Sequence, residues 1–325
     1  MRSIVVARGA TPFPVCRSVA AIEARRPRDN GRVALLLTPV ELDVLLRADR
    51  SGGSTPTSGA VRVLDVRYRL DRPDGRPDHL DGHVPGAVYV DLESELSRHG
   101  RADEGRHPLP SLEALQAAAR SWGLNDGDTV VVYDDARSLG ASRAWWLLTR
   151  SGVADVRVLD GGLSAWVAAG LPLESGDVAA TAGDVTLHPL AETVLGIDEA
   201  DALAASGVLV DVRAAERYRG EVDPVDPVAG HIPGAVNLPT THYMDGERFR
   251  DAATLRELFA GVGIVPGTEA AAYCGSGVTA AQAVFAAELA GLELRIFPGS
   301  WSQWSNTPGR PVATGPALSD VTAMI

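Results

Sequence analysis

The chain has 325 residues, of which 45 % are hydrophobic and 22 % charged, a composition typical of a globular protein long enough for two hydrophobic cores. Its formal net charge of -12 argues against a nucleic-acid partner, and no apolar run reaches the roughly 20 residues that span a bilayer. Two cysteines, Cys16 and Cys274, are too few for a disulfide framework or a four-ligand zinc site, so we expect a cytoplasmic protein without a bound metal.

The N-terminal segment, residues 1–36, is rich in arginine and poor in acidic residues. It lacks the continuous apolar core of a secretory signal, and we expect it to be a disordered extension. Cys16 falls inside this segment and is given no role.

The rest of the chain carries one sequence plan twice. In the first copy, residues 37–174, a β-branched run ends in Asp-Val-Arg and leads to a Gly-His-Val-Pro-Gly-Ala-Val turn. A predicted strand, an Ala-rich helix, a second strand and a Gly-containing turn with tryptophan follow. The segments of this copy are 61–67, 82–88, 128–134, 142–149, 156–159 and 161–166.

We place a linker at residues 175–192, which are poor in large apolar side chains, the second copy at 193–315 and a short tail at 316–325. Short apolar strands that alternate with helices predict an α/β fold in each copy, with a mainly parallel sheet flanked by helices. Ligands of such sheets bind beyond the carboxyl ends of the strands. The corresponding segments of the second copy are 208–213, 230–236, 268–274, 279–289, 294–297 and 299–304.

One loop of the second copy has the residues expected around a reactive cysteine. Cys274 follows a predicted strand, and Gly275 and Gly277 lead into a helix. Glycines let backbone N–H groups converge, and the N–H groups at a helix start favour negative charge. The loop therefore favours a thiolate and would hold the terminal sulfur anion of a persulfide. The first copy has Asp134 at the matching position, so it cannot carry out thiolate chemistry.

Two other interpretations of this loop stay open from the residues alone. Cys274 could be a buried cysteine in a tight turn, since unpaired cysteines are commonly buried. A tyrosine-phosphatase loop also begins with cysteine between a strand and a helix, but it needs an arginine six residues later to hold phosphate. This chain has Ala280 there.

Both copies resemble the rhodanese domain, over about residues 37–315. The markers are the two His-x-Pro-Gly-Ala turns, Ser-Arg-Ala-Trp-Trp at 142–146, Asp-Gly-Gly at 160–162 and Gly-Ser-Trp at 299–301. The loop from Cys274 to Thr279 looks like that of 3-mercaptopyruvate sulfurtransferases. The resemblance implies two rhodanese-like domains, the first catalytically silent and the second catalytic, which agrees with the contrast between Asp134 and Cys274.

The resemblance further implies an enzyme in which Cys274 takes sulfur from 3-mercaptopyruvate as a persulfide. The acceptor would be a thiol, such as thioredoxin or glutathione, or cyanide, and no cofactor is expected. Ser276, His107 and Glu93 match the proton relay of the family, and Arg217 matches an arginine that binds the substrate. The position of a second such arginine holds Asp226, and Arg219 is a candidate replacement. The loop amides that would stabilise the anion belong to Gly275, Gly277, Val278 and Thr279.

Two alternative functions are a thiosulfate:cyanide sulfurtransferase and, from another class, a non-catalytic rhodanese module that only binds. Other residues receive structural interpretations. His83 and His231 occupy duplicated turns, and we expect both to be structural. Arg143 follows the silent loop, and we expect it to form an ion pair between the domains.

Overall fold

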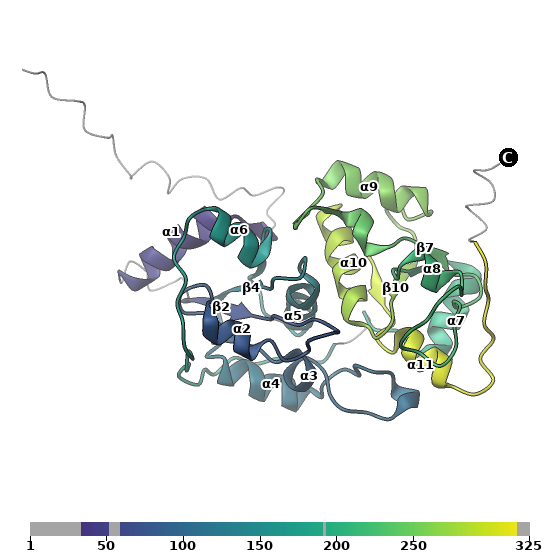
Figure 1. Ribbon diagram of the computed structural model, residues 1–325, viewed down its shortest axis with the longest axis horizontal. Helices are drawn as coiled ribbons and strands as arrows, with labels where there is room; N and C mark the ends of the chain where they lie inside the picture. Colours follow the sequence, from purple (N-terminus) through teal and green to yellow (C-terminus); the bar gives the residue numbers. More distant parts are fainter. Residues whose placement is uncertain (1–33, 52–58, 191–192, 317–325) are drawn as a thin grey trace, which may run out of the picture. The chain divides into compact units, whose positions relative to one another are not determined.

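The computed structural model describes residues 34–51, 59–190 and 193–316 (Figure 1). The predicted disorder of the extension and most of the predicted tail therefore fall outside the described residues. Leu36, which the sequence analysis assigns to the extension, belongs instead to the first strand, because it pairs with Val158 in the first sheet.

The first half forms a five-stranded parallel sheet in the order β1-β5-β4-β2-β3. Its strands are β1 (Leu36–Leu37), β2 (Val61–Asp65), β3 (Val88–Tyr89), β4 (Thr129–Tyr133) and β5 (Val156–Leu159). Its helices are α1 (Pro39–Arg50), α2 (Arg76–Asp81), α3 (Leu92–Glu95), the 3-10 helix η2 (Ala102–Glu104), α4 (Leu112–Ser121), α5 (Leu139–Arg150) and α6 (Gly162–Ala168).

The second half forms a four-stranded parallel sheet in the order β11-β10-β6-β7, with a separate antiparallel pair β8-β9. Its strands are β6 (Val208–Asp211), β7 (Val236–Asn237), β8 (Met244–Asp245), β9 (Arg248–Phe249), β10 (Ala270–Tyr273) and β11 (Arg295–Ile296). Its helices are α7 (Ile197–Ser206), α8 (Ala215–Tyr218), the 3-10 helix η3 (Thr240–Tyr243), α9 (Ala252–Gly261), α10 (Val278–Leu289) and α11 (Ser300–Asn306). The predicted α/β fold is confirmed in both halves.

Strand β4 shows why these strands are apolar on both sides. Val130 and Val132 pack into the core cluster that contains α4 and α5, whereas Val131 and Tyr133 pack into the cluster that contains α1 and α6. Because helices cover both faces, the strand has no polar face, as is usual for parallel sheets.

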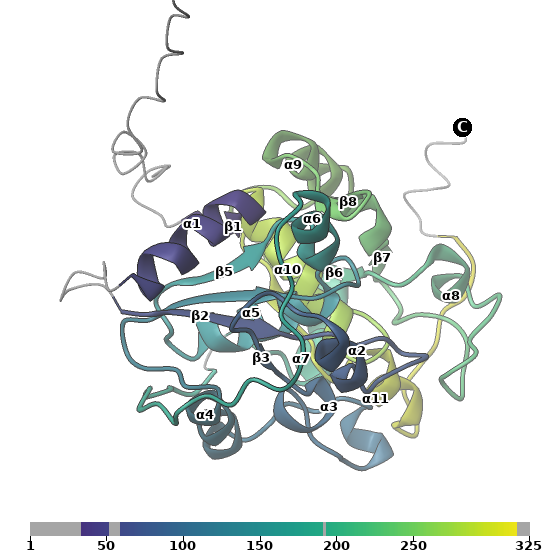
Figure 2. The ribbon, with the colours of Figure 1, turned by 60° about the vertical axis from the view of Figure 1, so that its left-hand side comes forward.

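One large hydrophobic cluster runs through both halves, and each half has in addition a smaller cluster of its own. Helices α5 and α10 lie side by side (Figures 1 and 2). Trp145 of α5 meets Phe285 of α10 edge to face, with ring centroids 4.7 Å apart. Phe249 of β9 also contacts Phe285, at 5.0 Å. Helix α10 is apolar on nearly all sides because its own sheet and α5 both cover it.

The two segments predicted as Gly-containing turns with tryptophan are the starts of helices α6 and α11. Gly162 and Ser300 occupy the same position in the two halves, with φ of 57° and 54°. This left-handed residue redirects the chain from the strand into the helix. Trp166 and Trp304 then pack in the core, and each donates its indole N–H to a carbonyl beyond the helix.

The described part of the predicted linker packs against the first half. Val185 and Leu187 are buried in the shared core, and the Val185 amide donates to the carbonyl of Leu124. These two apolar side chains tie the segment to the first sheet's helices.

We expect Phe285→Ala to lower the free energy of unfolding by about 3 to 5 kcal/mol, because it leaves a cavity between α5 and α10. Urea denaturation measures the change. Val265→Ala, at a half-exposed valine, is the control and should change stability by about 0.5 kcal/mol or less. Equal effects of the two variants would contradict the shared core.

Candidate active site

Cys274 directly follows β10, and a three-residue turn, Gly275 to Gly277, joins it to α10. Its side chain is buried, and the Gly277 amide donates to Sγ at 3.0 Å. Gly277 has a φ of 86°, and a Cβ there would lie 2.2 Å from the carbonyl oxygen of Pro298. Only glycine fits this turn, which aims a helix-start N–H group at the sulfur.

The loop is held by the first turn of α11. The Cys274 amide donates to Ser300 Oγ at 3.1 Å, the Trp301 amide to the carbonyl of Cys274 at 3.0 Å, and the Ser302 amide to the carbonyl of Gly275 at 2.8 Å. The left-handed φ of Ser300 makes these contacts reachable. Trp301 is buried and donates its indole N–H to the carbonyl of Val228, which is a packing role.

The structure brings Ser276, His107 and Glu93 together, although they come from both halves. His107 Nδ1 lies 2.7 Å from Ser276 Oγ, and His107 Nε2 lies 3.0 Å from Glu93 Oε1. Glu93 can only accept when ionised, so Nε2 carries the proton and Nδ1 accepts the hydrogen bond of the serine hydroxyl. Burial lowers the pKa of His107, although Glu93 opposes this, so the imidazole is neutral at neutral pH.

A cavity of about 330 Å³ opens beside Cys274. Side chains of both halves line it, because the halves meet at this edge of the second sheet. Its lining includes the predicted residues Arg217, Gly275, Ser276, Val278 and Thr279, and also Tyr68 and Arg106 from the first half.

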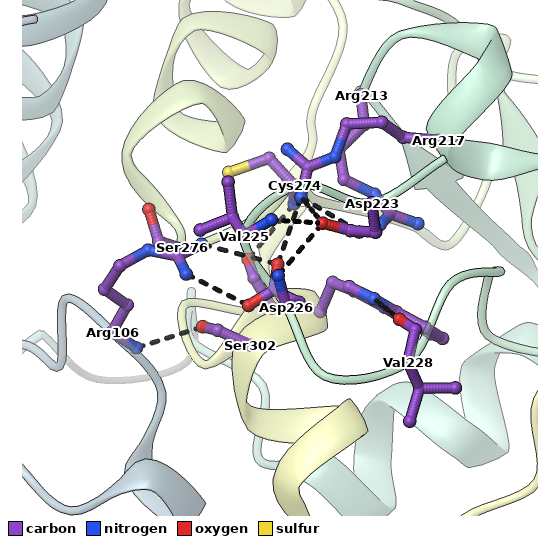
Figure 3. A network of polar contacts seen from close by, with 12 residues as sticks. Arg106, Arg213, Arg217, Asp223, Val225, Asp226, Val228, Cys274, Ser276 and Ser302 are labelled. Carbon is purple, nitrogen blue, oxygen red and sulfur yellow. Dashed lines mark hydrogen bonds and ion pairs between the residues drawn. The ribbon is translucent and has the colours of Figure 1, made fainter. Parts of the chain in front are cut away.

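Arg217 is held by two carboxylates (Figure 3). Its Nη2 donates to Asp223 Oδ1 at 2.9 Å and to Asp226 Oδ2 at 3.0 Å. Arg219 pairs with Glu221 at 2.6 Å and does not line this cavity, so it is no replacement for a second arginine.

Sequence reasoning missed Arg106. Its Nη1 donates to Asp226 Oδ1 at 3.0 Å, and its amide donates to Ser302 Oγ at 3.0 Å. Its place in the sequence could have pointed to it, because Arg106 directly precedes the predicted site residue His107.

The predicted ion pair of Arg143 is not formed among the described residues, and that prediction is wrong. The buried guanidinium donates instead to three backbone carbonyls: Leu96 at 3.2 Å, His107 at 3.4 Å and Gly277 at 3.4 Å. Burial lowers its pKa to about 10. Arg143 still links the halves, because Gly277 lies in the Cys274 loop.

The first half has the same kind of cradle, with the carboxyl group of Asp134 inside. Asp134 Oδ1 accepts from the amides of Ala136 at 2.8 Å and Ser138 at 2.9 Å, and Oδ2 accepts from the amide of Ala141 at 2.9 Å. The carboxylate therefore occupies the start of α5 as the Cys274 sulfur occupies the start of α10.

The duplicated histidines lie in structural positions, as predicted. His83 Nδ1 donates to the carbonyl of His79, and His231 Nδ1 to the carbonyl of Tyr218, both at 2.7 Å. Behind them, buried Asp-x-Arg pairs repeat in the two halves, Asp65–Arg67 and Asp211–Arg213, each at 2.6 Å.

Within the described residues, no group of three or more His, Cys, Asp or Glu side chains could hold a metal ion. No helix of the described ranges is long and apolar enough to cross a membrane.

Comparison with known proteins gives a consistent result. The family model "Rhodanese-like domain" matches residues 54–169 and 196–307. A protein called putative thiosulfate sulfurtransferase SseB, from Mycobacterium tuberculosis, is 48% identical over 278 residues, which are 84% of this chain and 98% of that protein. A probable 3-mercaptopyruvate sulfurtransferase from Pseudomonas aeruginosa is 45% identical over 263 residues, which are 78% of this chain and 92% of that protein.

Among solved structures, SseA from Escherichia coli, described as a 3-mercaptopyruvate sulfotransferase with the rhodanese fold, superimposes with a TM-score of 0.71. It is 29% identical, and the match covers 83% of this chain and 99% of that one. The similarity therefore extends over both halves.

The pH dependence of stability should report the buried carboxyl group of Asp134 in the cradle of the first half. Burial raises the pKa of Asp134 to about 6, so the folded chain keeps this proton at pH values where the unfolded chain has released it. The stabilisation is present below about pH 4 and is lost as the pH rises through 6. Relative to Asp134→Asn, the wild type should lose up to about 3 kcal/mol between pH 4 and pH 7 in urea denaturation. The opposite slope would show that the three amides outweigh burial.

Proposed function

The chain is a sulfurtransferase of the rhodanese family, and from that premise we propose that it moves sulfur from 3-mercaptopyruvate through a persulfide on Cys274 to a thiol or to cyanide. Residues 37–174 serve as the silent copy and residues 193–315 as the catalytic one. Thioredoxin or glutathione would be suitable thiol acceptors.

The observation that carries this choice of donor is the hydrogen-bonded chain from Ser276 through His107 to Glu93 beside the nucleophile. Release of pyruvate requires a C–S bond to break and a carbon to gain a proton, so a proton relay is useful. Sulfur transfer from thiosulfate releases sulfite and needs no such proton. A buried neutral histidine oriented by a carboxylate is suited to this work.

The steps balance without an added oxidant. The Cys274 thiolate attacks the donor sulfur, an S–S bond forms, and the C–S bond breaks with its electron pair left on the pyruvate enolate. The proton of the donor thiol passes through Ser276 to His107 and returns to the enolate carbon, which gives pyruvate. The Gly277 amide and the other loop amides, from Gly275, Val278 and Thr279, stabilise the persulfide anion.

In the second half-reaction an acceptor thiolate or cyanide attacks the outer sulfur. The S–S bond breaks and its electron pair returns to Cys274, which is again a thiolate. The acceptor leaves as a persulfide or as thiocyanate. Arg217 binds the donor's carboxylate in the first step, as a guanidinium matches a planar carboxylate.

Thiosulfate is the second candidate donor, since the relative that is 48% identical carries that name. Steady-state sulfur transfer from each donor separates the two. Ser276→Ala should slow transfer from 3-mercaptopyruvate by about 100-fold or more and leave transfer from thiosulfate nearly unchanged. Cys274→Ser is the control and should abolish persulfide formation, read by intact mass, with both donors. A wild type that uses only thiosulfate would overturn the proposed donor, and a wild type that never gains sulfur would favour a binding module.

The relay also predicts a pH profile. Burial lowers the pKa of His107, so the imidazole stays neutral down to pH values below its ordinary value of about 6.5 and is protonated only in more acidic solution. Single-turnover persulfide formation from 3-mercaptopyruvate should stay constant from pH 8 to about 6.5 and fall in more acidic buffer. His107→Gln should be slow at every pH and lack this acid limb. Alkylation of Cys274 by iodoacetamide over the same range corrects for ionisation of the thiol, and an acid limb that persists in the variant would remove His107 from the relay.

A further inference from the structure

Two arginines from opposite halves converge beside the nucleophile (Figure 3). A Cβ built on Gly275 would lie 3.4 Å from Arg217 Nη1 and 3.5 Å from Arg106 Nη2. Both guanidinium groups thus reach the same point next to Cys274, and a side chain at Gly275 would fill it. One planar anionic group can receive N–H donors from both arginines there.

Asp226 bridges the two arginines. Its Oδ1 lies 3.0 Å from Arg106 Nη1, and its Oδ2 lies 3.0 Å from Arg217 Nη2. The Asp226 side chain is only 2% exposed, so its charge is poorly screened by water. This carboxylate holds the guanidinium groups in one arrangement and cancels part of their charge.

The support behind this bridge is rigid. Asp223, also buried, accepts from the amides of Val225 and Asp226 at 3.1 and 3.0 Å, and from Arg217 at 2.9 Å. Although burial opposes it, these contacts hold the pKa of Asp223 below its ordinary value, so it remains ionised. On the other side, the Arg106 backbone is fixed by Ser302 Oγ.

The charges at this point are nearly balanced. Arg106 and Arg217 face Asp223 and Asp226, while Arg213 pairs with Asp211 and with Asp223. A cavity with so little excess positive charge suits a donor with one negative charge better than a donor with two, because each added charge must be desolvated.

We propose that Arg106 and Arg217 form a carboxylate-binding fork for the sulfur donor, and that Asp226 positions both arginines and selects a singly charged donor over a doubly charged one. The inference deepens the proposed function and rests on it. It assigns a substrate-binding residue to the catalytically silent half.

The test compares full-length variants in steady-state assays with 3-mercaptopyruvate and with thiosulfate. Arg106→Gln should raise KM for 3-mercaptopyruvate by about 10- to 100-fold, the usual cost of losing a hydrogen bond to a charged group, with kcat nearly unchanged. Arg106→Lys keeps the charge without the planar fork and should recover part of this loss. Arg101→Gln is the matched control, because Arg101 is an exposed arginine of the same loop that pairs with Asp103, and it should leave KM unchanged.

Asp226→Asn tests selectivity. The amide keeps the size of the side chain and removes its charge, so kcat/KM for thiosulfate should rise relative to that for 3-mercaptopyruvate by about 10-fold. An unchanged KM in Arg106→Gln, or a loss confined to kcat, would overturn the fork. Equal changes for both donors in Asp226→Asn would overturn the selectivity. If the wild type uses thiosulfate alone, the proposed donor fails, while KM for thiosulfate in Arg106→Gln still decides the role of Arg106.

Discussion

The packing of α5 against α10 is the contact on which the rest of the site depends. Each helix begins at the carboxyl end of a strand of its own sheet, so the side-by-side packing brings the two helix starts and their loops together. Both helices are buried along most of their length, and separating them would expose a continuous core. The geometry around Cys274 is therefore set by the same contact that holds the halves together.

Because of this packing, the first half supplies much of the site. Glu93 and His107 reach Ser276, Arg106 reaches Asp226, and Arg143 reaches the carbonyl of Gly277. The second half supplies Cys274 and its cradle. The second half alone would have Cys274 but none of His107, Glu93 and Arg106, which gives a physical reason for keeping a copy that lacks a cysteine.

The fold and half of the site could be predicted from the sequence because their signals are local or duplicated. The parallel sheets follow from apolar strands that alternate with helices, and the cradle follows from the glycines between Cys274 and the next helix. The grouping of Ser276, His107 and Glu93 came from the resemblance, and the structure brings them within hydrogen-bond distance.

The ion pair of Arg106 with Asp226 could not be predicted, because the two residues are 120 positions apart and meet only through the packing of the halves. The sequence shows Asp226 where the resemblance implies an arginine, and its neighbouring residues do not indicate which arginine it pairs with. The predicted ion pair of Arg143 is wrong for a related reason. A buried arginine can be satisfied by carbonyls, and the sequence does not show where backbone carbonyls point.

Asp134 and Cys274 occupy matching positions in the two halves, with different numbers of hydrogen-bond donors around them. Three amides surround this carboxyl group at 2.8 to 2.9 Å, whereas the Cys274 sulfur receives one amide at 3.0 Å. The first half thus holds its carboxyl group with three N–H donors, and the second half holds its sulfur with one.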